Sequence, residues 1–177
     1  GFLNYICITD PKGETEEKRL DDLLARSIDG IIFFSYQKNA QFLKKLKHLS
    51  QHTPIISCDL MFLNEGISCI CADGKKGTYE AVRHLYDSGR KRIAYIKGKK
   101  EYTVVNKRFQ GYCDALEDFD LLFNDQWVCE VDFDRQSGVK AAQHLMQLDE
   151  VPDAIVCATD HLAVGVLDYL NRNNYKV

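Results

Sequence analysis

Proline, low-complexity tracts and long apolar runs are all scarce in this chain of 177 residues, which contains only three Pro. A long flexible linker is therefore not expected between its parts. No stretch approaches the ~20 apolar residues that a membrane-spanning helix needs. The first residues, GFLNYICITD, lack the basic region of a secretory signal and lead almost directly into a predicted strand. We therefore expect a cytoplasmic protein without membrane contact.

A dominant block of Lys and Arg is also missing, and the formal net charge is -3. Surfaces that hold nucleic acid are usually basic, so these residues alone are not expected to bind DNA. The composition is otherwise that of a folded protein, with 45% hydrophobic and 28% charged residues. Such a chain can bury a core in one domain or in two small lobes.

Motifs for catalysis, nucleotide hydrolysis and metal binding are absent. The GKKGT and GKK segments at 74–78 and 98–100 lack the spacing of a phosphate-binding loop. No Ser/His/Asp or Cys/His arrangement indicates a nucleophile with its base. The His residues show no metal-ligand spacing, and neither does the pair Cys69 and Cys71. We therefore predict neither enzyme activity nor a metal or other cofactor.

Cysteines are numerous but odd in number. Most of the seven lie inside apolar, strand-like segments such as YICIT, SCICA and AIVCA. This pattern favours small buried side chains in a reducing compartment over a disulfide framework.

Apolar, strand-like segments alternate regularly with amphipathic helical patterns. The strand-like segments are 4–9, 30–35, 54–59, 67–72, 92–97, 127–131 and 153–158. The helical patterns are 14–28, 38–49, 75–88, 105–118, 136–148 and 161–173. Continuous apolar strands between amphipathic helices predict an α/β fold with parallel sheets flanked by helices.

The alternation breaks once, where MFLNEG joins the strands at 54–59 and 67–72 without a helix. A break of this kind indicates a crossing between two lobes, and we place it near Ala72. The predicted N-terminal lobe is 1–72 and the predicted C-terminal lobe is 73–177.

Several segments of the second half occur in a characteristic order. DGKKGTYEAVRHLYDSGRKRIAYIKG begins at Asp73, and it is followed by RFQGYCDAL at 108–116 and PDAIVCATDHLAVG at 152–165. The ordered set is similar to the effector-binding core of the lactose-repressor (LacI/GalR) family of bacterial transcription regulators. In the first half, SIDGIIFFS and PIISCD resemble the first lobe of that core. The resemblance covers nearly the whole chain.

The resemblance implies a two-lobed fold, like that of periplasmic sugar-binding proteins, that closes over a sugar or other small polar effector. It also implies dimerisation through both lobes and DNA binding only through an N-terminal helix-turn-helix headpiece. That headpiece is not found in this sequence, and we expect a core that is incomplete at both ends. The helices at 14–28 and 75–88 are candidates for the contact in a homodimer.

Arg108 and Asp160 are the first candidate effector-binding residues. In open α/β sheets a ligand lies outside the carboxyl ends of the strands, so both side chains should face one crevice. Arg108 is predicted in the first turn of its helix, where the helix dipole disfavours a cation, so another group should hold it there. Its fork of donors suits vicinal hydroxyls or a carboxylate. The alternative is an ion pair with a neighbouring lobe.

Thr159 shares the position between a strand and a helix with Asp160, whose alternative role is to cap the helix at 161–173. The family commonly has Asn where this chain has Thr159, and another Asn where it has Gly74. An aspartate pair of the family falls beyond Val177. The resemblance therefore leaves the identity of the effector open.

Phe133 follows the strand at 127–131, where the family often places an aromatic ring against the effector. Such a ring suits the C–H face of a sugar or a purine, and the alternative is a core position. Asp59 ends a strand of the first lobe and matches a crevice position of the family; its alternative role is that of a turn residue. Ser35 and Tyr36 are similar rim positions.

These observations favour the effector-sensing module of a DNA-binding transcriptional regulator, in which closure of the lobes repositions the headpiece. One alternative is a stand-alone sugar-binding protein of the same fold. Another is a flavodoxin-like enzyme domain, which a bound flavin or nucleotide would reveal.

Overall fold

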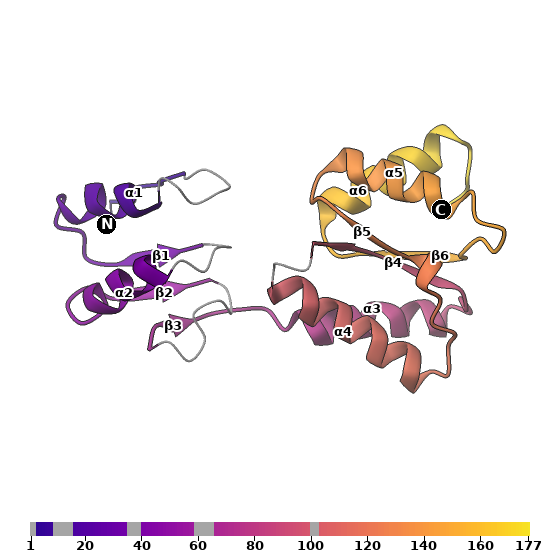
Figure 1. Ribbon diagram of the computed structural model, residues 1–177, viewed down its shortest axis with the longest axis horizontal. Coiled ribbons are helices and arrows are strands. Elements are labelled where there is room, and N and C mark those ends of the chain that lie inside the picture. The colour runs from indigo at the N-terminus through magenta and orange to yellow at the C-terminus, as the bar shows by residue number, and fades with distance from the viewer. Residues whose placement is uncertain (1–2, 9–15, 35–39, 59–65, 100–102) are drawn as a thin grey trace. The chain divides into compact units, whose positions relative to one another are not determined.

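The computed structural model of the chain describes residues 3–8, 16–34, 40–58, 66–99 and 103–177. The chain divides into two compact units, Gly1–Ala72 and Asp73–Val177. Each unit contains its own three-stranded parallel sheet with helices packed on it (Figure 1). The predicted α/β fold with parallel sheets is confirmed.

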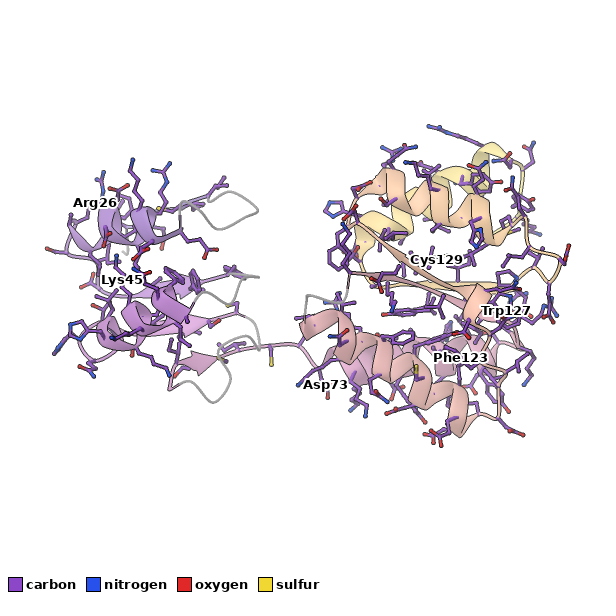
Figure 2. The ribbon with its side chains drawn as sticks, in the orientation of Figure 1. Arg26, Lys45, Asp73, Phe123, Trp127 and Cys129 are labelled. Atoms are coloured by element: carbon purple, nitrogen blue, oxygen red, sulfur yellow. The ribbon has the colours of Figure 1, made fainter. Side chains whose placement is uncertain are left out.

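The first unit has a small core between two helices and a short sheet. Its elements are α1 (Glu16–Leu24), β1 (Ile31–Phe33), α2 (Ala40–Leu49), β2 (Ile55–Ser57) and β3 (Ser68–Cys69). The strands pair in the order β1-β2-β3. Five buried residues make the core: Leu20, Phe42, Leu46, Ile55 and Ile67. Lys45 of α2, labelled in Figure 2, also forms a salt bridge with Asp21 of α1. Its Nζ lies 2.6 Å from Asp21 Oδ1.

The strand predicted at 4–9 is wrong where the structure describes it, because residues 3–8 have no regular structure. Residues 3–7 line a hollow of about 1020 Å³ that β1 and α1 also line. The segment has no cross-strand partner among the described residues, and Ile6 and Ile8 are 90% and 83% exposed. A strand requires such a partner, which local alternation cannot supply.

The second unit is larger and has a sheet covered on both faces. Its elements are α3 (Gly74–Asp87), β4 (Ile93–Gly98), α4 (Thr103–Asp118), a 3₁₀ turn (Asp125–Trp127), β5 (Val128–Val131), α5 (Arg135–Leu145), β6 (Ala154–Cys157) and α6 (Asp160–Arg172). β4 is the central strand, in the order β5-β4-β6. Helices α3 and α4 cover one face of the sheet, and α5 and α6 cover the other (Figure 1).

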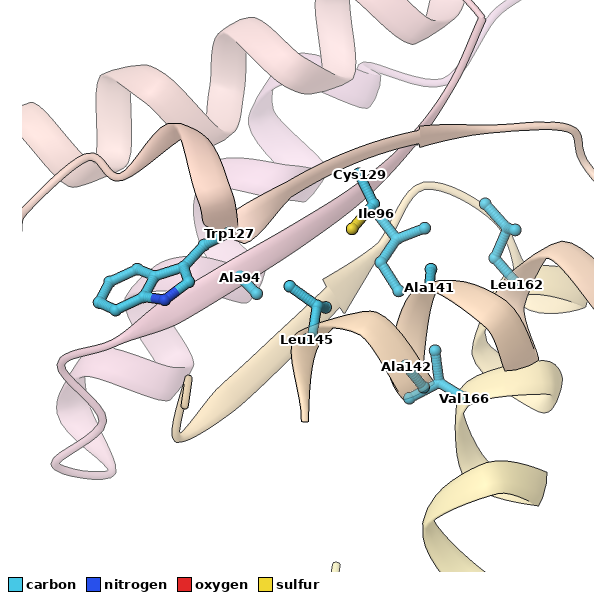
Figure 3. Packing of buried hydrophobic residues seen from close by; sticks show 9 residues of the cluster. All are labelled: Ala94, Ile96, Trp127, Cys129, Ala141, Ala142, Leu145, Leu162 and Val166. Atoms are coloured by element: carbon cyan, nitrogen blue, oxygen red, sulfur yellow. The ribbon is translucent and has the colours of Figure 1, made fainter. Parts of the chain in front are cut away.

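The two cores of this unit meet at β4, because successive side chains of a strand point to opposite faces. Ile93 and Tyr95 pack on the α3 and α4 side. Ala94 and Ile96 pack on the α5 and α6 side (Figure 3). The remaining residues of that second cluster are Trp127, Cys129, Ala141, Ala142, Leu145, Leu162 and Val166.

Side-chain caps fix where two of these helices begin. Asp73 accepts a hydrogen bond from the backbone N–H of Lys76 at 3.0 Å and starts α3. Asp134 does the same for Ser137 at 2.8 Å and starts α5. Such caps satisfy backbone donors that have no partner within the helix.

The cysteines are all free thiols, but they are not all buried. Cys129 is buried and four others are half-buried, whereas Cys7 and Cys71 are exposed, so the burial expected for the set is wrong at these two positions. Burial raises the pKa of Cys157 to about 12, which keeps that thiol protonated and unreactive at neutral pH. None of the helices in the described part of the chain has the length and apolarity that crossing a bilayer requires.

Candidate functional site

The carboxyl edge of the second unit's sheet carries four of the predicted effector-binding residues. At this edge Gly98 of β4 is level with Val131 of β5, and Ile96 of β4 is level with Cys157 of β6. The connection from β4 to β5 runs through α4 on one face, and the connection from β5 to β6 runs through α5 on the other. This reversal at the central strand is the place where open α/β sheets bind ligands.

Arg108 is held by contacts within its own unit. It is half-buried and is the sixth residue of α4, so its predicted place in the first turn is wrong, because the helix begins two residues earlier than expected. The side chain lies against Gly74, and its Nη1 donates a hydrogen bond to the Ala158 carbonyl. No carboxylate among the described residues forms an ion pair with Arg108.

Other cations at this edge are paired with acids. Lys97 is only 8% exposed, and its Nζ lies 3.0 Å from Glu130 Oε2. Lys99 Nζ lies 2.5 Å from Asp132 Oδ1. Arg135 of α5 likewise forms an ion pair with Asp168 of α6. Arg108, by contrast, is hydrogen-bonded in the described part of the chain to a carbonyl group, that of Ala158.

Thr159 and Asp160 lie at the start of α6. Thr159 is the N-cap residue and Asp160 is the first residue of the helix, so the alternative role of Asp160 as the N-cap is wrong. The Thr159 side chain makes no capping hydrogen bond, and its Oγ1 is buried without a hydrogen-bond partner among the described residues. Asp160 is exposed. Its carboxylate is at the favourable end of the helix dipole.

Phe133 lies at the same carboxyl edge of the sheet, beside the end of β4. Its ring occupies the space beside Gly98, where a Cβ would lie 2.0 Å from the ring Cζ. The ring is half-buried and packs against both hydrophobic clusters of the unit. Phe133 therefore has the core contacts of its alternative role, and it is only partly buried.

The Tyr95 hydroxyl is a polar group of this region that the sequence did not indicate. The side chain is 0% exposed, and its hydroxyl has no hydrogen-bond partner among the described residues. Burial raises the pKa of Tyr95 to about 12, against the lowering effects of the nearby Thr78 hydroxyl and the Arg108 charge. The Thr78 hydroxyl lies near enough to lower this pKa but does not meet the criteria for a hydrogen bond with Tyr95. An aromatic residue in a fully buried strand, as in IAYIKG, was the available signal.

Three predicted residues, Asp59, Ser35 and Tyr36, lie outside the described residues. Within the described part, no three His, Cys, Asp or Glu side chains gather as metal ligands would. A hollow of about 390 Å³ lies beside the N-terminal parts of α3 and α4, lined by Asp73, Lys75, Asn106, Lys107 and Gln110. Neither this hollow nor the one in the first unit is lined by Arg108, Phe133 or Thr159.

Related proteins are known from their sequences. Catabolite control protein A of Priestia megaterium is 31% identical over 160 residues, which are 90% of this chain and 48% of that protein. The HTH-type transcriptional repressor PurR of Actinobacillus pleuropneumoniae is 25% identical over 177 residues, the whole of this chain and 52% of that protein. The chain thus spans about half the length of the curated relatives it matches.

Solved structures show the same fold. The transcription regulator CcpA of Lactococcus lactis superposes with a TM-score of 0.76 at 26% identity, covering 96% of this chain and 62% of that one. A regulatory protein of the LacI family from Chloroflexus aggregans gives a TM-score of 0.74 at 24% identity, over 95% and 59%. The family model described as periplasmic binding proteins and sugar binding domain of the LacI family matches residues 3–177. The chain therefore belongs to this family.

Proposed function

We propose that this chain is the effector-sensing module of a LacI-family transcriptional regulator and has no enzyme activity of its own. Support comes from its relatives, which are named as a transcriptional repressor and a catabolite control protein. In this proposal the two units are the two lobes of the effector-binding core. A stand-alone sugar-binding protein is not favoured, because the relatives of known name are regulators.

The state of Arg108 is the observation that carries the proposal. Its guanidinium is half-buried at the carboxyl edge and is bonded to a carbonyl, whereas the neighbouring cations are bonded to carboxylates. Five N–H donors leave a guanidinium able to bind vicinal hydroxyls or a carboxylate after one contact is made. A small polar effector, such as a sugar or a sugar acid, supplies these groups.

Thr159 and Phe133 support the same ligand class. The buried Thr159 Oγ1 lacks a partner among the described residues, and a ligand hydroxyl would satisfy it. Phe133 is only partly buried, and an accessible face of its ring would suit the C–H groups of a sugar or a purine. Asp160 would add an acceptor for a ligand hydroxyl. From the first unit, Asp59, Ser35 and Tyr36 remain proposed contacts.

Several properties of the whole regulator belong to the proposal as well. DNA would be bound by a helix-turn-helix headpiece in a cytoplasmic homodimer, and effector binding would change the affinity of that headpiece for its operator. The name of one relative, an HTH-type repressor, supports the headpiece.

A ligand screen tests the proposed function. Thermal unfolding of the full chain would be followed with D-ribose, D-glucose, D-gluconate and adenine, each at millimolar concentration. A ligand present at a hundred times its dissociation constant stabilises the folded state by about 2.7 kcal/mol. A rise in melting temperature with a sugar or sugar acid would support the proposed ligand class, whereas stabilisation by none of the four would contradict it.

A further inference from the structure

Gly74 is directly beside the Arg108 side chain. It is the first residue of α3, immediately after the N-cap Asp73. A Cβ at position 74 would lie 2.9 Å from Arg108 Cγ and 3.3 Å from Arg108 Nε, and the three nearest atoms all belong to Arg108. Gly74 is not among the described residues with a positive φ. With Arg108 placed as it is, the absence of a side chain at position 74 matters for the space it leaves and not for the backbone conformation.

The space beside Gly74 lets Arg108 reach across the sheet edge. Its Nη1 donates to the carbonyl of Ala158, which is 6% exposed and directly precedes the N-cap residue Thr159. Arg108 thus links the first turn of α3 to the start of α6. Because a guanidinium is planar, fixing one of its nitrogens also orients the remaining N–H donors.

We propose that Gly74 is a positioning residue for the guanidinium of Arg108. The orientation set by Gly74 would select ligands whose oxygens meet the Arg108 N–H donors that the Ala158 carbonyl does not use. Only this consequence rests on the proposed function. A methyl group at position 74 would displace the Arg108 side chain and break its bond to Ala158. Gly74 itself need not touch the ligand.

The same helix offers a matched control. Gly77 is also in the first turn of α3 and is exposed, and a Cβ there would meet no atom within 4 Å. Gly74→Ala and Gly77→Ala make the same chemical change in the same helix. Only the first of them reaches Arg108.

A ligand-free experiment decides the inference. The full chain would be treated with phenylglyoxal, which modifies guanidinium groups, and modification of Arg108 would be followed by peptide mass spectrometry. The exposed Arg172 of α6 is the internal standard. We expect Gly74→Ala to raise the relative rate at Arg108 several-fold and Gly77→Ala to leave it unchanged. Equal rates in the wild type and both variants would overturn the inference.

If Gly74→Ala failed to fold, a second variant would show whether the clash with Arg108 is the cause. Since Arg108 supplies the nearest atoms, adding Arg108→Ala to Gly74→Ala is expected to restore folding. If the double variant also failed to fold, some group other than Arg108 would need the space, and the inference would be wrong.

Calorimetric titration with D-ribose, D-glucose and D-gluconate separates this inference from the proposed function. For a probe that the wild type binds, Gly74→Ala is expected to weaken binding at least fivefold, while Gly77→Ala leaves it unchanged. Faster labelling of Arg108 in Gly74→Ala than in the wild type, combined with no binding of any probe by the wild type, would support the role of Gly74 and contradict the proposed function.

Discussion

At the scale of single residues, Tyr95 and Tyr112 form a natural comparison. Both side chains are 0% exposed, and their rings stack with centroids 4.9 Å apart. Tyr112 donates its hydroxyl to the Ile93 carbonyl at 2.9 Å, whereas the Tyr95 hydroxyl has no partner among the described residues. Burial raises the pKa of both hydroxyls. The two residues therefore differ chiefly in one hydrogen bond.

Replacing each tyrosine by phenylalanine should give different results. Tyr112→Phe removes a buried hydrogen bond and is expected to lower the free energy of unfolding by about 1 kcal/mol. Tyr95→Phe removes a buried hydroxyl that lacks a partner, so we expect no loss and a gain of up to about 1 kcal/mol. Urea unfolding of both variants measures the difference. An equal loss in both would mean that the Tyr95 hydroxyl has a partner in solution.

At this scale the sequence indicated which segments follow a strand, whereas the roles of the candidate residues as effector contacts stay predictions. The segments that carry Arg108, Phe133, Thr159 and Asp160 all follow strands of one sheet, as the order of the motifs indicated. The contact of Arg108 with Ala158 joins residues 50 positions apart. No local pattern encodes such a contact.

At the scale of helices and strands, close packing of α5 on α6 depends on Gly165. A Cβ there would lie 2.1 Å from the Arg135 carbonyl oxygen and 2.9 Å from the Val139 nitrogen. Both atoms belong to the backbone of α5, so the clash cannot be relieved by rotating a side chain. The two helices must move apart to admit even a methyl group.

Gly165→Ala is therefore expected to destabilise the second unit by roughly 1 to 3 kcal/mol, the usual cost of overpacking. Gly77→Ala is the control, because its methyl group meets no neighbour, and it should change stability little or raise it by up to about 1 kcal/mol through helix propensity. Circular dichroism melts measure both. The packing account would be wrong if Gly165→Ala were as stable as Gly77→Ala.

Most elements could be predicted from hydrophobic periodicity, and the errors have physical causes. Strands such as β4 have apolar side chains on both faces and helices between them, which gives a strong local signal. The segment at 3–8 is also mostly apolar, but a strand forms only with a partner, and the partner is not a local property. Helices α4 and α6 begin two residues and one residue before the predicted positions, because hydrophobic periodicity marks the body of a helix better than its ends.

At the scale of the whole molecule, two units with separate sheets and cores carry a charge of -3. A protein that grips DNA through this surface would need clustered positive charge to displace counterions. Three cations at the edge of the second sheet, Lys97, Lys99 and Arg135, are instead paired with carboxylates.

Residues 1–177 are therefore expected not to bind operator-like DNA specifically. A gel-shift assay at physiological salt, with an excess of unrelated DNA as competitor, measures this. A retarded band that survives the competitor would show that sequence-specific contacts lie within these residues, and it would remove the need for a headpiece in the proposed regulator.

The most direct test of the proposed function is calorimetric titration of Arg108→Lys in the full chain with the ligand found by the thermal screen. Lysine keeps the charge but loses the planar fork, so binding should weaken by about 1.5 to 3 kcal/mol, roughly ten- to more than a hundredfold. Loss of the bond to Ala158 should cost the fold only about 1 kcal/mol. Unchanged affinity together with a large fall in melting temperature would make Arg108 a structural residue and contradict the proposed effector site.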